Sequence, residues 1–173
     1  PQGALFCFRG GMRSEIAQQW LQHAGVDYPR IKGGYKAMRS WLIEASDNLI
    51  SYERLLLVGG PTGAAKTRLL NEGHEGRPIP GSIDLEGLAN HRGSAFGRRV
   101  TEQPTQIGFE LALGTHLIKH RWNGHKKLIV EDEGRLIGRC ALPLVLQSAR
   151  GDADWGQLDA SIEARVQHSY ENY

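Results

Sequence analysis

Apolar side chains recur at helical spacing in two stretches near the start of the chain. One stretch predicts a helix over about 14–23, with an apolar side made of Ile16, Ala17, Trp20 and Leu21. The other predicts a helix over 35–45, with an apolar side made of Met38, Trp41 and Leu42. A short extended segment is expected before each helix, at 4–6 and at 28–31, and the polar stretch 46–53 predicts a linker.

Two continuous apolar runs follow, Leu55–Val58 and Leu128–Val130, and such runs are typical of strands buried in a parallel sheet. We expect one helix after the first run, through Leu70, and another over about 105–121. Strands that alternate with helices indicate an α/β fold with parallel strands.

The linker divides the chain into two predicted domains, 1–48 and 49–173. Only six residues precede Cys7, which is enough for one strand. Because a lone strand with two helices cannot form a sheet, we expect 1–48 to be the C-terminal part of a larger domain. Whether the second domain is complete at its C-terminus stays open.

The composition is that of a globular protein: of 173 residues, 40% are hydrophobic and 23% are charged. No apolar run approaches the length of a membrane span, and no signal segment opens the chain. Two cysteines, Cys7 and Cys140, cannot make a disulfide framework. These features predict a cytoplasmic protein without a membrane partner, in which the Cys7 thiol is free for chemistry.

Positive charge gathers between His91 and Lys127, where seven lysines and arginines stand against two acids, although the formal net charge of the chain is only +2. The stretch predicts a surface for an anionic partner. A solvated helix face with surplus charges is the competing interpretation. The seven basic residues are Arg92, Arg98, Arg99, Lys119, Arg121, Lys126 and Lys127.

The sequence "CFRGGMR" is a candidate reactive-cysteine loop. Its glycines allow the backbone at Gly10, Gly11 and Met12 to curl into an anion-binding nest at a helix N-terminus. The nest and Arg13 would favour the thiolate form of Cys7, which makes this cysteine a candidate nucleophile and Arg13 its catalytic partner. A buried cysteine before a glycine turn is the alternative.

Two enzyme chemistries use such a loop. Phosphatases of one class have five residues between cysteine and arginine, and rhodanese-like sulfurtransferases carry a sulfane sulfur or another chalcogen on the cysteine. The later stretch "RIKGGYKAMRSW" resembles the closing segment of rhodanese domains and favours chalcogen transfer. The spacing from Cys7 to Arg13 matches the phosphatase form and leaves room for a larger anion or atom.

The stretch "GGPTGAAKT" fits the Walker A phosphate-loop pattern, except that Ala65 stands where the second glycine belongs. Alanine is tolerable there if its dihedral angles are helical, since only a positive φ would exclude it. A glycine-rich turn with an incidental lysine is the alternative. The expected diphosphate-binding residues are Gly60, Thr62, Gly63, Ala65, Lys66 and Thr67.

The stretch "LIVEDE" has the form of a Walker B strand that ends in carboxylates. Because strand side chains alternate between faces, Glu131 and Asp132 cannot both face the phosphates. We take Asp132, together with the Thr67 hydroxyl, as the candidate Mg²⁺ ligands. For Glu133, an acidic strand end in solvent is an equally good interpretation.

These motifs, together with "DLEGLANHRGSAFG", "QPTQIGFE" and "VEDEGRLIG", resemble the tRNA 2-selenouridine synthase family over essentially the whole chain. That family joins a rhodanese domain to a P-loop domain. The resemblance therefore implies that 1–48 is the C-terminal part of a rhodanese-like domain and 49–173 a P-loop NTPase-like parallel-sheet domain. Family members are considerably longer, so the chain looks like an internal fragment. Phe8 stands where tryptophan is expected, and Ala65 weakens an inference of ATP hydrolysis more than one of diphosphate binding.

The resemblance also implies a reaction. The family geranylates 2-thiouridine at the tRNA wobble position with geranyl diphosphate, and replaces the sulfur by selenium from selenophosphate to give 2-selenouridine. We assign the selenium step to Cys7 and Arg13, and the diphosphate, with Mg²⁺, to the phosphate loop. The expected partner is tRNA, and a selenophosphate-producing enzyme is a candidate partner.

The tRNA would be held by basic residues of the stretch from His91 to Lys127, with Trp122 or Phe96 stacking on a base. His91 and Asp84 are candidates for a substrate pocket, although Asp84 would equally well cap a turn. Two other functions stay open: a non-catalytic nucleotide- and tRNA-binding module, and a rhodanese-type sulfurtransferase fused to a kinase-like domain. The residues expected to contact tRNA first are Arg92, Arg98, Arg99, Lys119 and Arg121.

Overall fold

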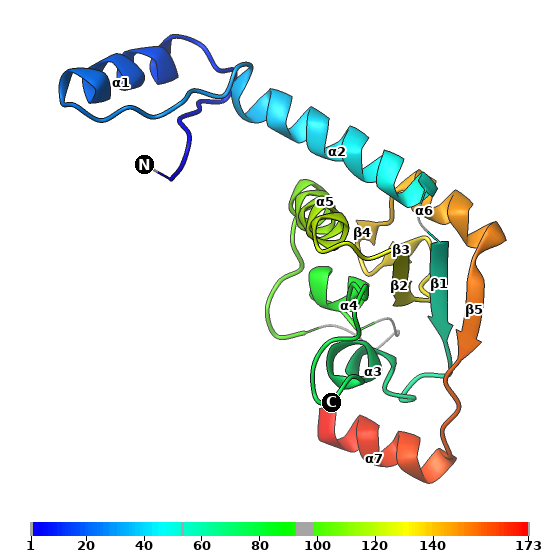
Figure 1. Cartoon of the computed structure of the whole chain (residues 1–173). Coiled ribbons are helices and arrows are strands. Elements are labelled where there is room, and N and C mark those ends of the chain that lie inside the picture. The colour runs from blue at the N-terminus through cyan, green and yellow to red at the C-terminus, as the bar shows by residue number, and fades with distance from the viewer. Residues whose placement is uncertain (1, 53, 93–98, 173) are drawn as a thin grey trace. The chain divides into compact units, whose positions relative to one another are not determined.

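The structure is a computed structural model that describes residues 2–52, 54–92 and 99–172. The chain divides into two compact units, Pro1–Glu44 and Ala45–Tyr173. Figure 1 gives the order of the helices and strands. Among the helices of these described ranges, none combines the length and the apolar composition needed to cross a bilayer.

The first unit contains α1 (Met12–His23) and the first part of α2 (Gly34–Tyr52), which confirms two predicted helices. The strand predicted at 4–6 does not form. Leu5 makes only an isolated parallel bridge with Arg30, closed by two backbone hydrogen bonds of 2.8 and 2.9 Å. Two short extended segments cannot build a stable ladder by themselves, so the pairing stops at one bridge.

The linker predicted at 46–53 is wrong as far as Tyr52, because α2 continues through it. Ser46 and Ile50 are buried, and Leu49 packs against the core of the second unit. The spacing of these three residues continues a helical period beneath the exposed polar residues of the same stretch. The polar composition of the stretch concealed that period.

The second unit is built on a three-stranded parallel sheet of order β2-β1-β5. β1 (Arg54–Gly59) is the central strand, between β2 (Lys127–Glu131) and β5 (Asp154–Gln157). β1 and β2 are the two apolar runs of the sequence, so the prediction of an α/β fold with parallel strands is confirmed. β5 has the short polar sequence "DWGQ", and its pattern gave no sign of a strand.

Helices follow β1 and β5, whereas β2 is followed by a short pair of strands. Between β1 and β2 lie α3 (Lys66–Glu72), α4 (Leu85–Leu88) and α5 (Gln106–Trp122), of which α5 confirms the helix predicted over 105–121. After β2 the chain forms an antiparallel pair, a short helical region and β5, and then ends in α7. The bounds of these later elements are β3 (Leu136–Ile137), β4 (Cys140–Ala141), α6 (Leu144–Ala149), η1 (Arg150–Asp152) and α7 (Ile162–Asn172). Figure 1 shows β1 and β5 pointing toward the end of the unit where α3 and α7 lie.

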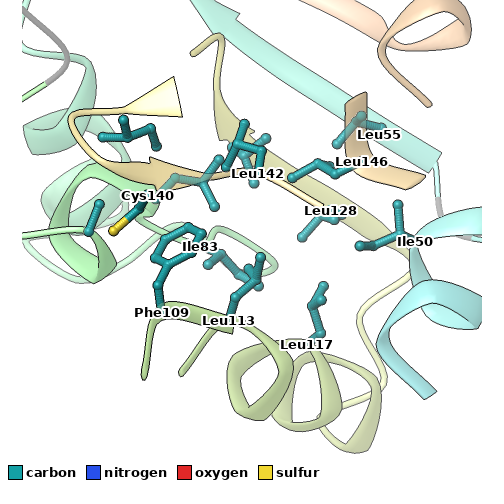
Figure 2. Packing of buried hydrophobic residues seen from close by; sticks show 14 of the residues in the cluster. Ile50, Leu55, Ile83, Phe109, Leu113, Leu117, Leu128, Cys140, Leu142 and Leu146 are labelled. Atoms are coloured by element: carbon teal, nitrogen blue, oxygen red, sulfur yellow. The ribbon is translucent and has the colours of Figure 1, made fainter. Parts of the chain in front are cut away.

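One apolar cluster forms the core of the second unit (Figure 2). Phe109, Leu113 and Leu117 come from one side of α5 and are at most 2% exposed. Leu128 of β2 and Cys140 of β4 belong to the same cluster. Cys140 is fully buried and behaves as a small apolar side chain, and burial raises the pKa of its thiol.

Because α5 is anchored by this cluster, Leu117→Ala should lower the free energy of unfolding by about 2–5 kcal/mol through lost burial and a residual cavity. Urea denaturation followed by far-UV circular dichroism measures the loss. Ile107→Ala is the matched control on the same helix, because Ile107 is 49% exposed, and it should cost less than about 1 kcal/mol. Equal losses for the two variants would contradict this account of the core.

Candidate functional site

The phosphate loop leaves β1 at its carboxyl end and enters α3 at Lys66. Ligands of open α/β sheets bind at this edge. Space around the start of the loop is tight: a Cβ at Gly59 would lie 2.5 Å from the Trp155 ring, and one at Gly60 would lie 2.6 Å from the Leu158 carbonyl oxygen. Both positions therefore require glycine, because β5 and the residue that follows it pass directly beside the loop.

Ala65 is in the left-handed region, with φ 62° and ψ 34°. Alanine would be tolerated here without strain only if its dihedral angles were helical, and they are not. A non-glycine residue in this region costs about 1–2 kcal/mol. The backbone follows the path that a glycine would take, and the alanine at this position is strained.

The two polar side chains at the start of α3 have defined partners. Lys66 Nζ donates to the Gly60 carbonyl at 3.1 Å, so it folds over the loop. The Thr67 hydroxyl donates to the carboxylate of Glu86 at 3.1 Å. Glu86 lies in α4 and is nearly buried. Sequence reasoning missed Glu86; the only signal was its place within the unusual string "DLEGLANHRGSAFG".

Asp84 has a structural role. Its side chain caps α4 by accepting from the Gly87 N–H at 2.6 Å, and it also accepts from the Asn71 side chain at 2.8 Å. These hydrogen bonds support the interpretation of Asp84 as a cap rather than as a residue of the substrate pocket.

Asp132 and Glu133, the two acids that follow β2, lie in different surroundings. The Asp132 carboxylate pairs with Arg150 and accepts from Trp155 Nε1 at 3.2 Å, so the carboxylate beside Thr67 is that of Glu86 instead. Glu133 is 8% exposed, which overturns the interpretation of a strand end in solvent. Burial, followed by a hydrogen bond with Glu86, raises the pKa of Glu133 well above its ordinary value.

Among the described acids of the unit, Glu131 is the most deeply buried, at 1% exposure. It accepts a hydrogen bond from the Leu85 N–H at 2.9 Å, which ties the end of β2 to the start of α4. Burial and, less strongly, the negative charge of Asp84 raise the pKa of Glu131 to about 9. Glu131 is therefore neutral near pH 7 and positions α4.

A cavity of about 550 Å³ lies over the phosphate loop. Its walls include residues 62–67 of the loop and two side chains of α7, His168 and Glu171. Arg165 of α7 donates through Nε to the Thr62 carbonyl at 2.9 Å, and a Cβ at Gly63 would lie 2.9 Å from Ser169 Oγ. α7, which the sequence analysis did not predict, therefore covers part of the loop.

The basic residues proposed for tRNA are divided between two places. Arg92 and Arg99 line the cavity over the phosphate loop. Lys119 and Arg121 are exposed in the last turn of α5, followed by Trp122, which is 89% exposed. Arg98 and Phe96 lie outside the described residues. Of the remaining basic residues, Lys127 is paired with Asp154 at 3.8 Å, and Lys126 is exposed.

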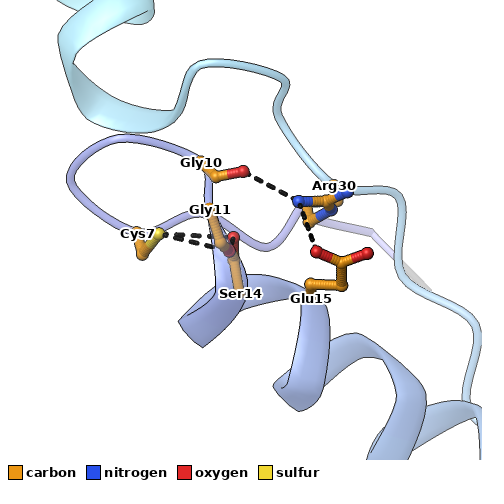
Figure 3. A network of polar contacts seen from close by, with 6 residues as sticks. All are labelled: Cys7, Gly10, Gly11, Ser14, Glu15 and Arg30. Atoms are coloured by element: carbon orange, nitrogen blue, oxygen red, sulfur yellow. Dashed lines mark hydrogen bonds and ion pairs between the residues drawn. The ribbon is translucent and has the colours of Figure 1, made fainter.

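The cysteine loop of the first unit is shown in Figure 3. Cys7 Sγ lies 3.3 Å from the Ser14 hydroxyl and 3.8 Å from the Gly11 carbonyl oxygen, at the N-terminus of α1. The hydroxyl and then the backbone of Ser14 are the main causes that lower the pKa of Cys7 to about 6. The thiolate is therefore the main form of Cys7 at pH 7.

Ser14, rather than Arg13, contacts the thiol. The side chains of Arg13 and Met12 are exposed, whereas Ser14 is 3% exposed, with its hydroxyl 2.9 Å from the Gly11 carbonyl oxygen. The hydroxyl has one hydrogen, which it donates to the sulfur when Cys7 is ionised and to the Gly11 carbonyl when Cys7 is protonated. Arg30 supports the loop from the other side by donating to the Gly10 carbonyl at 2.8 Å. Sequence reasoning missed Ser14 and Arg30.

The two motifs of the first unit meet through their backbones. Gly10 has a φ of 65°, and a Cβ on it would lie 2.6 Å from the amide nitrogens of Gly33 and Gly34. The N–H groups of Tyr35 and Lys36, at the start of α2, donate at 3.0 Å to the carbonyls of Cys7 and Phe8. The Phe8 and Tyr35 rings stack at 5.9 Å. The glycine pair Gly33 and Gly34, at the start of α2, thus allows the cysteine loop to dock on this helix.

No group of three or more histidine, cysteine or acidic side chains that could hold a metal ion occurs within residues 2–52, 54–92 and 99–172. Near the phosphate loop, the Thr67 hydroxyl and the Glu86 carboxylate lie 3.1 Å apart.

Residues 53–173 match the family model described as the tRNA 2-selenouridine synthase AAA domain. Proteins named tRNA 2-selenouridine synthase are similar over the whole chain. The one from Hahella chejuensis is 52% identical over 174 residues, and the one from Pseudomonas fluorescens is 46% identical over 173 residues. The chain spans 44% and 46% of the lengths of these two relatives. No solved structure matches it significantly.

Because Ala65 is strained by its positive φ, Ala65→Gly should raise the free energy of unfolding by about 1 kcal/mol. Urea denaturation followed by circular dichroism provides the measurement. The neighbouring Ala64 is 5% exposed and does not have a positive φ. Ala64→Gly should therefore lower the free energy of unfolding. A loss of stability in both variants would show that residue 65 is not strained.

Because Ser14 stabilises the thiolate, the rate at which iodoacetamide alkylates Cys7 should rise with pH around a midpoint near 6. Ser14→Ala should move this midpoint upward, toward the ordinary value of about 8.5 for a free thiol. Mass spectrometry of the modified protein follows the reaction. Cys7→Ser is the control, since buried Cys140 should react slowly at every pH tested. An unchanged midpoint in Ser14→Ala would contradict this role of Ser14.

Proposed function

The chain belongs to the tRNA 2-selenouridine synthase family, and we propose that it geranylates 2-thiouridine at the tRNA wobble position and then replaces the sulfur by selenium. Geranyl diphosphate and selenophosphate are the proposed co-substrates. The observation that carries the proposal is the presence of two different loops on one chain: one at the start of α1 holds a cysteine whose pKa is lowered to about 6, and one at the start of α3 holds a lysine folded over its backbone. The proposal includes a cytoplasmic location, because its substrate is tRNA.

Two anion sites suit this order of chemistry. In the first step, the thiouridine sulfur attacks the geranyl carbon that bears oxygen, the carbon–oxygen bond breaks, and the diphosphate leaves with the electron pair. The nucleoside loses a proton and keeps an S-geranyl group. In the second step, selenium from selenophosphate attacks C2, geranylthiolate leaves and takes up a proton, the selenium–phosphorus bond breaks, and the phosphoryl group ends on water as orthophosphate. Alkylation thus turns the sulfur into a better leaving group before selenium arrives.

The phosphate loop is the proposed site of the first step. Backbone N–H groups around Gly63 would bind the diphosphate oxygens, and the Lys66 ammonium would turn from the Gly60 carbonyl toward the departing charge. The cavity of about 550 Å³ falls within the range of small-ligand sites. The chain's own contribution is to orient the diphosphate and to stabilise its negative charge.

The residues beside Lys66 fit a magnesium ion. Thr67 and Glu86 offer a hydroxyl and a carboxylate 3.1 Å apart, and oxygen ligands of this kind are those that Mg²⁺ prefers. We propose Thr67 and Glu86 as its ligands in place of Thr67 and Asp132, because Arg150 and Trp155 occupy the Asp132 carboxylate. Bound Mg²⁺ would neutralise part of the charge of the leaving diphosphate.

The cysteine loop is the proposed site of the second step. The docking of this loop on the start of α2 supports the assignment of 1–48 as the C-terminal part of a rhodanese-like domain. We propose that the Cys7 thiolate attacks phosphorus and so breaks the selenium–phosphorus bond, after which water releases orthophosphate from the sulfur, and that Ser14 keeps Cys7 ionised. The exposed Arg13 is free to approach the phosphate group of the donor. Lys119 and Arg121 are the proposed tRNA contacts.

Because the two sites serve successive steps, Lys66→Ala should abolish geranylation, and Cys7→Ser should abolish selenation while geranylated tRNA accumulates. Mass spectrometry of nucleosides from thiolated tRNA incubated with the chain, geranyl diphosphate and selenophosphate measures both products. Arg77→Ala is the control, since Arg77 is an exposed loop residue paired with Glu75.

The reverse pattern, in which Lys66→Ala loses selenation and keeps geranylation, would mean that the two sites are exchanged. Binding of both tRNA and diphosphate without any product would favour a nucleotide- and tRNA-binding module. Sulfur transfer from thiosulfate with no effect of geranyl diphosphate would favour a sulfurtransferase.

A further inference from the structure

Arg92 and Arg99 lie on the wall of the phosphate-loop cavity, although they come from a different part of the chain than the loop. Arg92 follows α4, and Arg99 precedes α5. We infer that these two arginines hold the outer phosphate of a diphosphate whose inner phosphate rests on the phosphate loop. The inference rests on the proposed function and adds the residues that would select a diphosphate over a single phosphate.

The balance of charge around the cavity supports this assignment. Among the described cations on its wall, Lys66 and Arg68 both belong to α3. Lys66 reaches only as far as the loop, where it donates to the Gly60 carbonyl. A diphosphate carries more negative charge than one lysine neutralises, so its second phosphate needs further cations. Within the part of the chain that the structure describes, Arg92 and Arg99 are arginines of the wall that belong neither to the loop nor to α3.

The chemistry of arginine also fits an outer phosphate. A guanidinium group donates two parallel hydrogen bonds to phosphate oxygens, whereas the backbone N–H groups of the loop and the Lys66 ammonium act at the inner phosphate. Arg92 and Arg99 line the cavity. Lys119 and Arg121 lie elsewhere, in the last turn of α5, and do not belong to the cavity wall. Arg92 and Arg99 are therefore removed from the set expected to hold the tRNA backbone.

The folding of α4 explains how these arginines reach the cavity. Asp84 caps the helix, and the Leu85 N–H donates to the buried carboxyl of Glu131, so α4 is fixed to the end of β2. Glu86 of the same helix meets Thr67 at the start of α3. Arg92, which comes four residues after α4 ends, is thereby carried to the side of the sheet edge where the phosphate loop lies.

Titration calorimetry of the whole 173-residue chain with inorganic pyrophosphate and with orthophosphate tests the inference. Arg99→Ala should weaken pyrophosphate binding about tenfold or more and change orthophosphate binding by less than about twofold, because a charged hydrogen bond is lost only at the outer phosphate. Arg92→Lys should weaken pyrophosphate binding to a smaller extent, because the charge remains and the forked geometry is lost. Arg77→Ala, outside the cavity, is the matched control and should bind like the unaltered chain.

Filter binding of a tRNA transcript is the second measurement. Arg99→Ala should keep its tRNA affinity within about twofold, whereas a variant with Lys119→Ala and Arg121→Ala should lose tRNA affinity and keep pyrophosphate affinity. Unchanged pyrophosphate affinity in both Arg99→Ala and Arg92→Lys, or a loss confined to tRNA, would overturn the inference. Lys66→Ala separates this outcome from failure of the proposed function: if it binds pyrophosphate like the unaltered chain, the loop itself is not the diphosphate site.

Discussion

The parallel pairing of β1 with a strand on each side is the constraint on which the site of the larger unit depends. It brings three carboxyl ends to one edge of the sheet, and the pairing continues past the strands: the Asp132 N–H donates to the Val58 carbonyl at 2.9 Å, and the Leu158 N–H to the Gly59 carbonyl at 2.8 Å. The phosphate loop therefore starts between two neighbouring backbones. Side chains at Gly59 and Gly60 would collide with Trp155 and Leu158, so the glycines of this motif are required by the sheet before any ligand is considered. The acids that follow β2 and the segment that leads to α7 start at the same edge of the sheet.

The parts of the fold that the sequence predicted are those whose signal is local. Leu55–Val58 and Leu128–Val130 are apolar throughout because both faces of β1 and β2 are covered, and α5 shows a helical period because one side enters the core. β5 has no such signal: its side chains are largely exposed, and its place in the sheet depends on backbone pairing with β1. The same limit applies to the linker predicted at 46–53, where burial of Ser46 and Ile50 against a distant part of the chain decides that α2 continues. The dihedral angles of Ala65 were equally inaccessible, because they are imposed by the closure of the loop between β1 and α3.

The candidate site divides in the same way. Motif spacing indicated the cysteine loop and the phosphate loop, since both need glycines and one reactive or basic side chain at fixed separations. The partners of those side chains are Ser14 for Cys7 and Glu86 for Thr67. Serine and glutamate occur throughout any chain, so residue type alone does not single them out. Glu86 is separated from Thr67 by 19 residues, and only the capping of α4 and its attachment to β2 bring the two together. Sequence patterns thus locate loops well, but the residues that tune their chemistry are chosen by packing.

The two loops stabilise negative charge by different physical means, and this difference bears on what each can bind. Cys7 is partly exposed, and hydrogen bonds from Ser14 keep its thiolate stable without a buried counter-charge, so the sulfur remains accessible. At the phosphate loop, Lys66 lies near a pair of buried acids, Glu86 and Glu133, whose negative charge would repel a phosphate. Burial raises the pKa of Glu133, and the proton that Glu133 therefore retains removes part of that repulsion. A divalent cation that accompanied a diphosphate would remove it as well, because a cation displaces a proton from carboxyl ligands. The phosphate loop is therefore suited to a ligand that brings its own counter-ion, whereas the cysteine loop is suited to an anion that arrives without one.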